Sequence, residues 1–459
     1  MNFHQKIAQC FSPAAFIHDS EENYQALEKL ILEQEIGGLT FFHSRHSAAA
    51  NFEKRAEVLD VSGTLEKMIA LINRYQAISK TPLLISIDGE YGLAMRIEKT
   101  PQEVGYRIGL DMKAAGIHLN LAPCSDVNTN PNNPVIGYRS FGTDPQKVAE
   151  NSLAMYQGMK KAGIGACLKH FPGHGDTQTD SHLGLPVIQK SKEELKKEEL
   201  FPFQFGIDNG VEMIMVGHLA APALSGGKEI AASISREIIT DLLKVEMGFD
   251  GIVISDALNM KAVADLFPEP GQLEWEAFHA GNDILCFSDH VKEGIEQISK
   301  NAAEEEIEAV FNKVWALKEK LGVFDFKSLE MPEFDWNSHS EFQANLAKKY
   351  VSVISGKIDS EELKRLASQG KLSHQCFFGN NDTTFSKILN QKYASDITKI
   401  SIDKAEKVII SLFVPSHKPL NQFGMDKETV DKIKNLAQTK SCILVHFGNP
   451  LALKHLGDL

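Results

Sequence analysis

The segment KHFPGHGDTQTDSH, residues 169–182, concentrates three histidines, two aspartates and a lysine. These side chains could bind a metal, hold a phosphate or transfer protons. Histidines that bind zinc often lie three or four residues apart on one face of a helix. His170 and His174 have that spacing, but Phe, Pro and Gly lie between them and predict a loop. Two nearby aspartates would repel a phosphate. We therefore expect no metal site and favour proton transfer.

The DSH triplet that ends this segment has the spacing of an acid–base pair. Asp180 lies two residues before His182, and such positions face the same side of an extended segment. The carboxylate would fix the imidazole tautomer and stabilise the imidazolium, so the pair could donate and accept a proton near neutral pH. A hydrogen-bonded surface turn is the alternative interpretation.

A second kind of carboxylate follows the apolar run GIVIS. Asp256 comes directly after this run, and a carboxylate held at a strand end can attack an electrophilic carbon. The alternative is a cap for the following helix. Asp256 as nucleophile and His182 as acid and base would support two-step displacement at an acetal carbon. Imidazole would then replace one of the two carboxyl groups that glycosidases usually employ.

The elements that must position these residues are short apolar runs alternating with amphipathic helical patterns, such as residues 23–35 and 237–248. Short, fully apolar strands separated by helices predict a parallel sheet that helices cover on both faces. Eight of them within residues 1–326 favour a (β/α)8 TIM-type barrel, with a doubly wound open sheet as the alternative. The runs are 14–17, 38–42, 83–87, 118–122, 165–169, 213–216, 251–255 and 283–287.

The remainder of the chain predicts a second, smaller domain. A polar, proline-containing linker is predicted over residues 327–344, and an open-sheet α/β domain over 345–459. This domain is predicted to be minimal or cut short. Its strand candidates are 351–354, 375–379, 407–414 and 441–448.

The active residues of a (β/α)8 barrel sit at the C-terminal ends of its strands. Several polar residues of this chain follow predicted strands in that way, and we expect them to gather at one mouth. They are Asp88, Asp126, Lys169, His170, His218 and Asp256. Met215, inside the run 213–216, is instead predicted to pack in the barrel.

Four segments resemble glycoside hydrolase family 3, in its β-N-acetylglucosaminidase branch. They are IDGEYGLAMRI, LAPCSDVNTNPNNPVIGYRSFG, KHFPGHGDTQTDSH and GIVISDALNM, and they cover most of residues 80–290 in the family's order. The KHFPGHG…DSH loop is the most specific, because the β-glucosidase and xylosidase branches lack the DSH dyad. The chain departs from the family's pattern in two places: PQEVGYRIGL follows MRIEKT without the usual loop, and the C-terminal domain ends early.

The resemblance implies a role for each matching residue. Asp256 corresponds to the catalytic nucleophile, and His182 with Asp180 to the acid/base dyad. The sugar-binding residues it implies are Asp88, Arg96, Arg139, Lys169 and His170. Simpler alternatives are an Asp88–Arg96 ion pair at a strand end and a loop-anchoring role for Arg139.

The implied activity is that of a retaining exo-β-N-acetylglucosaminidase that needs no cofactor. Its substrates would carry terminal GlcNAc, with peptidoglycan-derived fragments first and chitooligosaccharides next. A β-N-acetylglucosaminide phosphorylase is an alternative, since a neutral imidazole does not repel phosphate. A catalytically idle sugar-binding protein is an alternative from a different class, but binding sugar requires neither the nucleophile nor the dyad.

The composition limits the partners. With 459 residues, 43% hydrophobic and 24% charged, the chain is typical of a globular protein with a sizeable core. A net charge of -13 argues against nucleic acid, and no apolar run approaches the ~20 residues that cross a bilayer. The six cysteines form no CxxC pair. We expect a cytoplasmic protein from the sequence as it stands, or a periplasmic or secreted one if a leader has been removed. The oligomeric state stays open.

Overall fold

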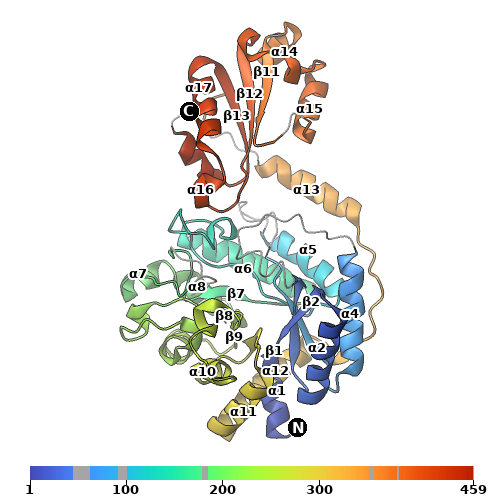
Figure 1. Cartoon of the computed structure of the whole chain (residues 1–459), viewed down its shortest axis with the longest axis vertical. Helices are drawn as coiled ribbons and strands as arrows, with labels where there is room; N and C mark the ends of the chain where they lie inside the picture. Colours follow the sequence, from blue (N-terminus) through green and yellow to red (C-terminus); the bar gives the residue numbers. More distant parts are fainter. Residues whose placement is uncertain (45–62, 91–100, 178–183, 351–354, 380–381, 458–459) are drawn as a thin grey trace. The chain divides into compact units, whose positions relative to one another are not determined.

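A computed structural model describes the chain except residues 45–62, 91–100, 178–183, 351–354, 380–381 and 458–459 (Figure 1). The described residues form two compact units. The first comprises Met1–Asn130 and Arg139–Tyr350, and the second comprises Pro131–Tyr138 and Val351–Leu459. The predicted linker, 327–344, overlaps a helix that belongs to the first unit. None of the helices that the structure describes is long and apolar enough to span a lipid bilayer.

The strands of the first unit overlap the eight predicted runs, except for β1, which lies just before the first of them. They are β1 (Phe11–Ser12), β2 (Ala14–His18), β3 (Gly38–Ser44), β4 (Leu84–Ile87), β5 (Leu119–Asn120), β6 (Gly165–Ala166), β7 (Leu168–Phe171), β8 (Met213–Val216), β9 (Ile252–Ser255) and β10 (Leu285–Cys286). Only Pro13 separates β1 from β2, and only Cys167 separates β6 from β7, so each pair is one interrupted strand.

Parallel pairing joins these strands into a ring. The order β2-β3-β4-β5-β6 is followed by β7-β8-β9, and β1 pairs with β10. Cys167 donates its N–H to the carbonyl of Ala122 between β6 and β7. A bridge between Ile254 and Ile284 connects β9 to β10. The predicted barrel architecture is therefore confirmed, and Figure 1 shows its strands surrounded by helices.

The helices of this unit are α1 (Phe3–Ala8), α2 (Glu21–Gln34), α4 (Thr64–Ile78), α5 (Pro101–Ala114), α6 (Pro145–Ala162), α7 (Lys192–Lys197), α8 (Phe201–Asp208), α9 (Lys261–Ala264), α10 (Gln272–Ala280), α11 (Val291–Asn301), α12 (Glu304–Lys320) and α13 (Trp336–Tyr350). Short 3-10 turns are η1 (Gly137–Arg139), η2 (Pro222–Leu224), η3 (Ala232–Ile234) and η5 (Val323–Asp325), and η4 (Glu237–Glu246) is a π-helix.

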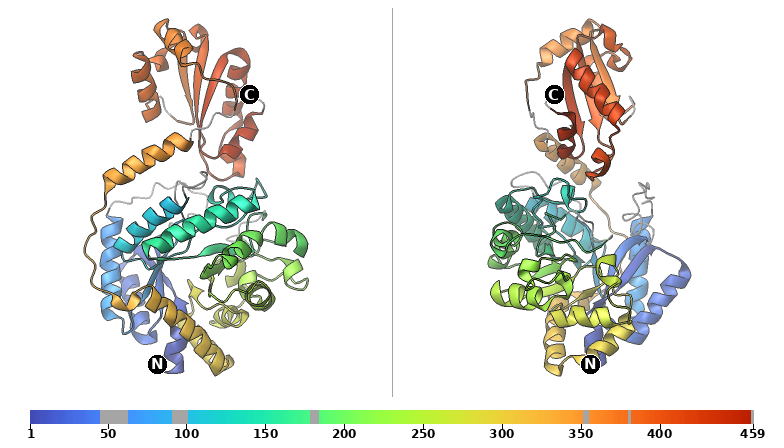
Figure 2. Two further views of the ribbon diagram at one scale, coloured as in Figure 1. Left: turned by 180° about the vertical axis from the view of Figure 1, so that it is seen from behind. Right: turned by 60° about the vertical axis from the view of Figure 1, so that its left-hand side comes forward.

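Helices α5 and α6 lie side by side (Figure 2). A Cβ on Gly105 would approach the Met155 carbonyl oxygen to 2.2 Å, and one on Gly158 would approach that of Gln102 to 2.1 Å. These positions therefore require glycine, because the two backbones are almost in contact there.

The interior of the barrel is apolar at the level of its strands. One cluster combines Phe16 of β2, Leu119 of β5, Met215 of β8 and Ile254 of β9 with Leu317 of α12. Residues from strands around the whole ring can meet only inside it. The packing role predicted for Met215 is confirmed.

The second unit is a three-stranded parallel sheet in the order β11 (Leu372–Phe377), β12 (Lys407–Phe413), β13 (Ser441–Phe447). Val408 and Ile410 pack with helix α17 (Lys427–Thr439) on one face, whereas Ile409 packs with helix α14 (Ser360–Ser368) on the other. Three predicted strands are thus confirmed, and the fourth, 351–354, lies outside the described residues. The helices are α14 (Ser360–Ser368), α15 (Thr384–Tyr393), α16 (Leu420–Phe423) and α17 (Lys427–Thr439), with turns η6 (Ile397–Lys399), η7 (Ile402–Lys404) and η8 (Pro450–Leu456).

Candidate active site

The C-terminal ends of β4 and β7 meet in an ion pair. Lys169 of β7 places its Nζ 2.7 Å from Oδ1 of Asp88, the residue after β4. The lysine side chain is 1% exposed, whereas that of Asp88 is 41% exposed. Burial disfavours the ammonium, but the charges of Asp88 and Glu90 outweigh it and keep the pKa of Lys169 above its usual value. Asp88 is therefore the member of the pair that an incoming ligand can reach.

Glu90 joins the lysine to a second cation. Its Oε1 lies 2.5 Å from Lys169 Nζ, and its carboxylate accepts hydrogen bonds from Nε and Nη2 of Arg139 at 2.7 and 2.5 Å. Burial opposes ionisation of Glu90, but the charges of Arg139 and Lys169 hold the pKa of its carboxyl well below the usual range. Sequence reasoning missed Glu90, although it lies two residues after Asp88 in the IDGEYG motif.

Asp126 holds the first residues of the 169–182 segment in place through hydrogen bonds. It is fully buried, and it accepts the backbone N–H groups of His170 and His174 and the Nδ1–H of His170, the last at 2.8 Å. Arg139 Nη2 lies 3.2 Å from His170 Nε2, which therefore acts as the acceptor. Burial opposes the charge of Asp126, but His170 and these hydrogen bonds hold the pKa of Asp126 well below its usual range.

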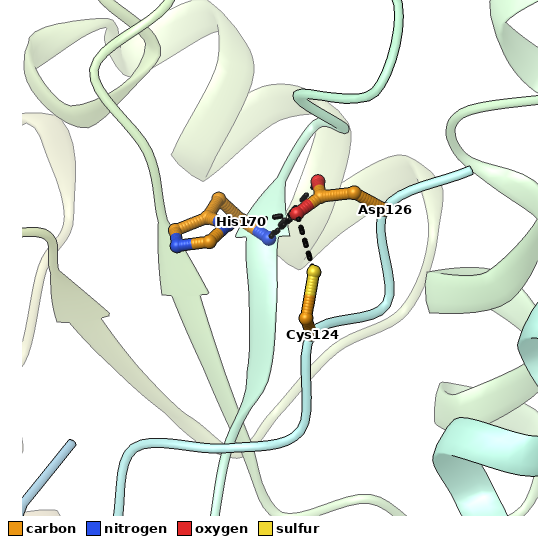
Figure 3. A group of neighbouring side chains, drawn as sticks. All are labelled: Cys124, Asp126 and His170. Atoms are coloured by element: carbon orange, nitrogen blue, oxygen red, sulfur yellow. Dashed lines mark hydrogen bonds and ion pairs between the residues drawn. The ribbon is translucent and has the colours of Figure 1, made fainter. Parts of the chain in front are cut away.

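Cys124, Asp126 and His170 are the one group in the described chain whose possible metal-ligating atoms cluster, all within 4.8 Å (Figure 3). The Cys124 thiol donates to Asp126 Oδ2 at 3.1 Å, and burial raises the pKa of Cys124. A thiol that stays protonated is a poor metal ligand. Hydrogen bonding accounts for the arrangement of these three side chains.

The glycines of the segment permit close packing of the backbone. A Cβ on Gly175 would lie 1.7 Å from the Val127 carbonyl oxygen, and Gly173 adopts a φ of +122°. Between them, His174 is buried and its Nδ1 lies 2.7 Å from the hydroxyl of Thr177. Burial lowers the pKa of His174 to about 4, so it is neutral. Through these contacts His174 helps to shape the loop.

Asp256 follows β9 and faces the same group of charges. The Ala257 N–H donates to its Oδ1 at 2.8 Å. Burial disfavours the carboxylate, but His218, His170, this hydrogen bond and the charge of Lys169 together lower the pKa of Asp256 to about 2. The helix-cap alternative is wrong, because α9 begins at Lys261 after the N-cap Met260.

The expectation that strand-end residues gather is met in the described residues by Asp88, Asp126, Lys169, His170, His218 and Asp256, and Arg139 of η1 joins them. Three further candidates lie outside the described residues: Asp180 and His182 in 178–183, and Arg96 in 91–100.

Residues 3–317 match the domain described as the glycosyl hydrolase family 3 N terminal domain. The chain belongs to glycosyl hydrolase family 3. It is 28% identical over 462 residues to β-hexosaminidase A of Pseudoalteromonas piscicida, covering 87% of this chain and 75% of that protein. It is 34% identical over 242 residues to a β-hexosaminidase of Tolumonas auensis, covering 48% of this chain and 70% of the relative.

Solved structures agree on the fold of this family 3 chain. The glycoside hydrolase family 3 β-N-acetylglucosaminidase of Paenibacillus sp. str. FPU-7 superposes with a TM-score of 0.74 at 24% identity, covering 99% of this chain and 92% of that one. The family match and the β-hexosaminidase relatives together show that the chain is a glycoside hydrolase of the β-hexosaminidase branch, as the resemblance implied.

Proposed function

We propose that this glycoside hydrolase is a retaining exo-β-N-acetylglucosaminidase that removes terminal β-linked GlcNAc. The observation that carries the proposal is the position of Asp256, which directly follows β9 and whose Oδ1 accepts the Ala257 N–H at 2.8 Å; the lowered pKa of this carboxyl agrees with that role. A site that only bound sugar would need hydrogen-bonding groups but no such nucleophile. The names of the hexosaminidase relatives support GlcNAc as the sugar.

In the first step, Asp256 attacks the anomeric carbon and the bond to the aglycone oxygen breaks. Ala257 N–H holds Oδ1, so we assign the attack to Oδ2. His182 donates a proton to the departing oxygen. In the second step, His182 accepts a proton from water as the water attacks the anomeric carbon and releases Asp256. Two displacements at one carbon retain the β configuration.

The charged groups beside the nucleophile supply the sugar-binding contacts. Lys169 and Arg139 are donors and Asp88 is a reachable acceptor, and charge-assisted hydrogen bonds to hydroxyls are strong. Glu90 keeps the two cations together through its contacts with both. We propose that Asp88, Lys169, His170 and Arg139 bind the GlcNAc ring, together with Arg96.

Peptidoglycan-derived fragments are the proposed natural substrates. Product analysis on a muropeptide beside chitobiose tests this, because an enzyme for chitooligosaccharides would turn over only the second. Assays of p-nitrophenyl β-GlcNAc with and without phosphate test the acceptor. Release of GlcNAc 1-phosphate would assign the chain as a phosphorylase.

The Asp256→Ala variant tests the mechanism. We expect a loss of several orders of magnitude in kcat, because the covalent partner is removed. Asp250→Ala is a matched control, since Asp250 is exposed and precedes the same strand, and it should keep wild-type activity. More than about a tenth of the wild-type rate in Asp256→Ala would show that Asp256 is not the nucleophile.

A further inference from the structure

A buried histidine outside the proposed mechanism contacts the residue that follows the nucleophile. His218 follows β8 and is fully buried. Its Nε2 lies 2.9 Å from the carbonyl oxygen of Ala257, and its Nδ1 lies 2.7 Å from the hydroxyl of Ser233. The carbonyl can only accept, so Nε2 carries a proton. The imidazole therefore links Ser233 to the backbone of the residue after Asp256.

The Ala257 backbone is the part of the structure that holds the nucleophile. Its N–H donates to Asp256 Oδ1 at 2.8 Å, while its carbonyl accepts from His218 on the other side of the same Cα. The Asp256 N–H is bound to the carbonyl of Val216, two residues before His218. The end of β8 thus contacts the nucleophile segment in two ways: the Val216 carbonyl accepts from Asp256 N–H, and the His218 side chain donates to the Ala257 carbonyl.

Ser233, which contacts the other nitrogen of the His218 ring, is itself held in place. Ser233 is fully buried in the short turn η3, and its carbonyl accepts from the side-chain amide of Asn282 at 2.8 Å. The hydroxyl that faces His218 Nδ1 is therefore held in place. A fixed hydroxyl fixes the imidazole orientation, as partners of the second ring nitrogen commonly do.

We propose that His218 is a positioning residue for the nucleophile: through Ser233 on one side and Ala257 on the other, it holds the Asp256 carboxylate in the orientation required for attack. This inference rests on the proposed function, since it assumes that Asp256 attacks the sugar. His218 does not touch the sugar in this role. It restrains the Ala257 backbone, whose N–H holds the Asp256 carboxylate.

The test compares His218→Phe, which removes the donor, with His218→Gln, which can keep an N–H near the position of Nε2. We expect single-turnover glycosylation by His218→Phe to fall by about 100-fold, because small displacements of a reacting group cost that much. The inhibition constant for GlcNAc should stay within about threefold, since the sugar-binding groups are untouched. His218→Gln should recover most of the lost rate.

Two further variants guard against a simple folding defect. Ser233→Ala removes only the anchor of Nδ1, and we expect a smaller loss, about tenfold. His374→Phe is a matched control, because His374 is also buried and hydrogen-bonded to a serine, Ser411, but lies in the second unit. It should keep the wild-type rate.

The outcomes separate the positioning role from the proposed function. A wild-type rate in His218→Phe, a loss that His218→Gln does not relieve, or an equally weakened affinity for GlcNAc overturns the positioning role while the proposed function stands. If Asp256→Ala is as active as the wild-type protein, the proposed function fails, and the positioning role fails with it.

Discussion

Lys318 is the clearest source of pH-dependent stability in the first unit. It lies in α12 and is fully buried. Its Nζ donates to Oε1 of Gln9 at 2.8 Å and to the carbonyl oxygen of Gly37 at 3.0 Å. Both acceptors are neutral, and burial lowers the pKa of Lys318 from 10.5 to about 7. We expect the Lys318→Met variant to lose a defined part of the pH dependence of folding.

The direction in which stability changes with pH is set by how many protons the folded and unfolded chains bind. Between pH 7 and 10.5 the unfolded chain keeps a proton on Lys318 that the folded chain has released, so stability rises with pH. A pKa difference of about 3.5 corresponds to a penalty of about 5 kcal/mol that is fully present below pH 7 and has vanished above pH ~10.5. About 3 kcal/mol of it should be relieved between pH ~6.5 and ~9.5.

Urea unfolding of the full chain, followed by tryptophan fluorescence, measures this difference. Trp315 reports locally, since Lys318 Nζ lies 6.0 Å from its ring. The free energy of unfolding of the wild type should rise by about 3 kcal/mol relative to Lys318→Met between the two pH values. Lys300→Met is the control, because Lys300 is exposed, and it should follow the wild type. A wild-type minus Lys318→Met difference that is the same at both pH values would show that Lys318 stays charged in the folded protein.

Three further predictions concern the active site. Glu90→Gln should destabilise the protein by about 3–5 kcal/mol in urea unfolding, because it removes the negative charge between the buried cations Lys169 and Arg139. The control Glu103→Gln, at an exposed ion pair, should cost less than about 1 kcal/mol. Equal losses in the two variants would contradict a special role for Glu90. Asp180→Asn should slow single-turnover glycosylation. Substrates with activated leaving groups should be affected least, because they need little acid assistance from His182. An equal loss of rate for activated and natural leaving groups would speak against the Asp180–His182 dyad. Dialysis against EDTA should leave activity unchanged, because attack by a carboxylate needs no metal-bound hydroxide; stoichiometric zinc whose removal abolishes activity and whose return restores it would overturn this expectation.

The sequence by itself determined the framework of the first unit. Apolar runs of strand length alternate with amphipathic helices, and this periodicity reflects local burial, which short segments encode. Because a barrel exposes the C-terminal ends of its strands at one mouth, the run boundaries also indicated that Asp88, Lys169, His170 and Asp256 would converge. The loop between His170 and His174 was likewise local, since it follows from the proline and glycine that separate them.

Tertiary structure decided which charges pair and what holds them. Glu90 contacts both Lys169 and Arg139, and Asp126 contacts His170. Neither arrangement has a periodic signal, because the partners are about 44 to 79 residues apart in sequence. That Asp256 does not cap α9 depended on where this helix begins, at Lys261. The burial of Lys318 against Gln9 and Gly37 joins segments some 300 residues apart. Such contacts depend on how the ring of strands closes in space, which no single segment encodes.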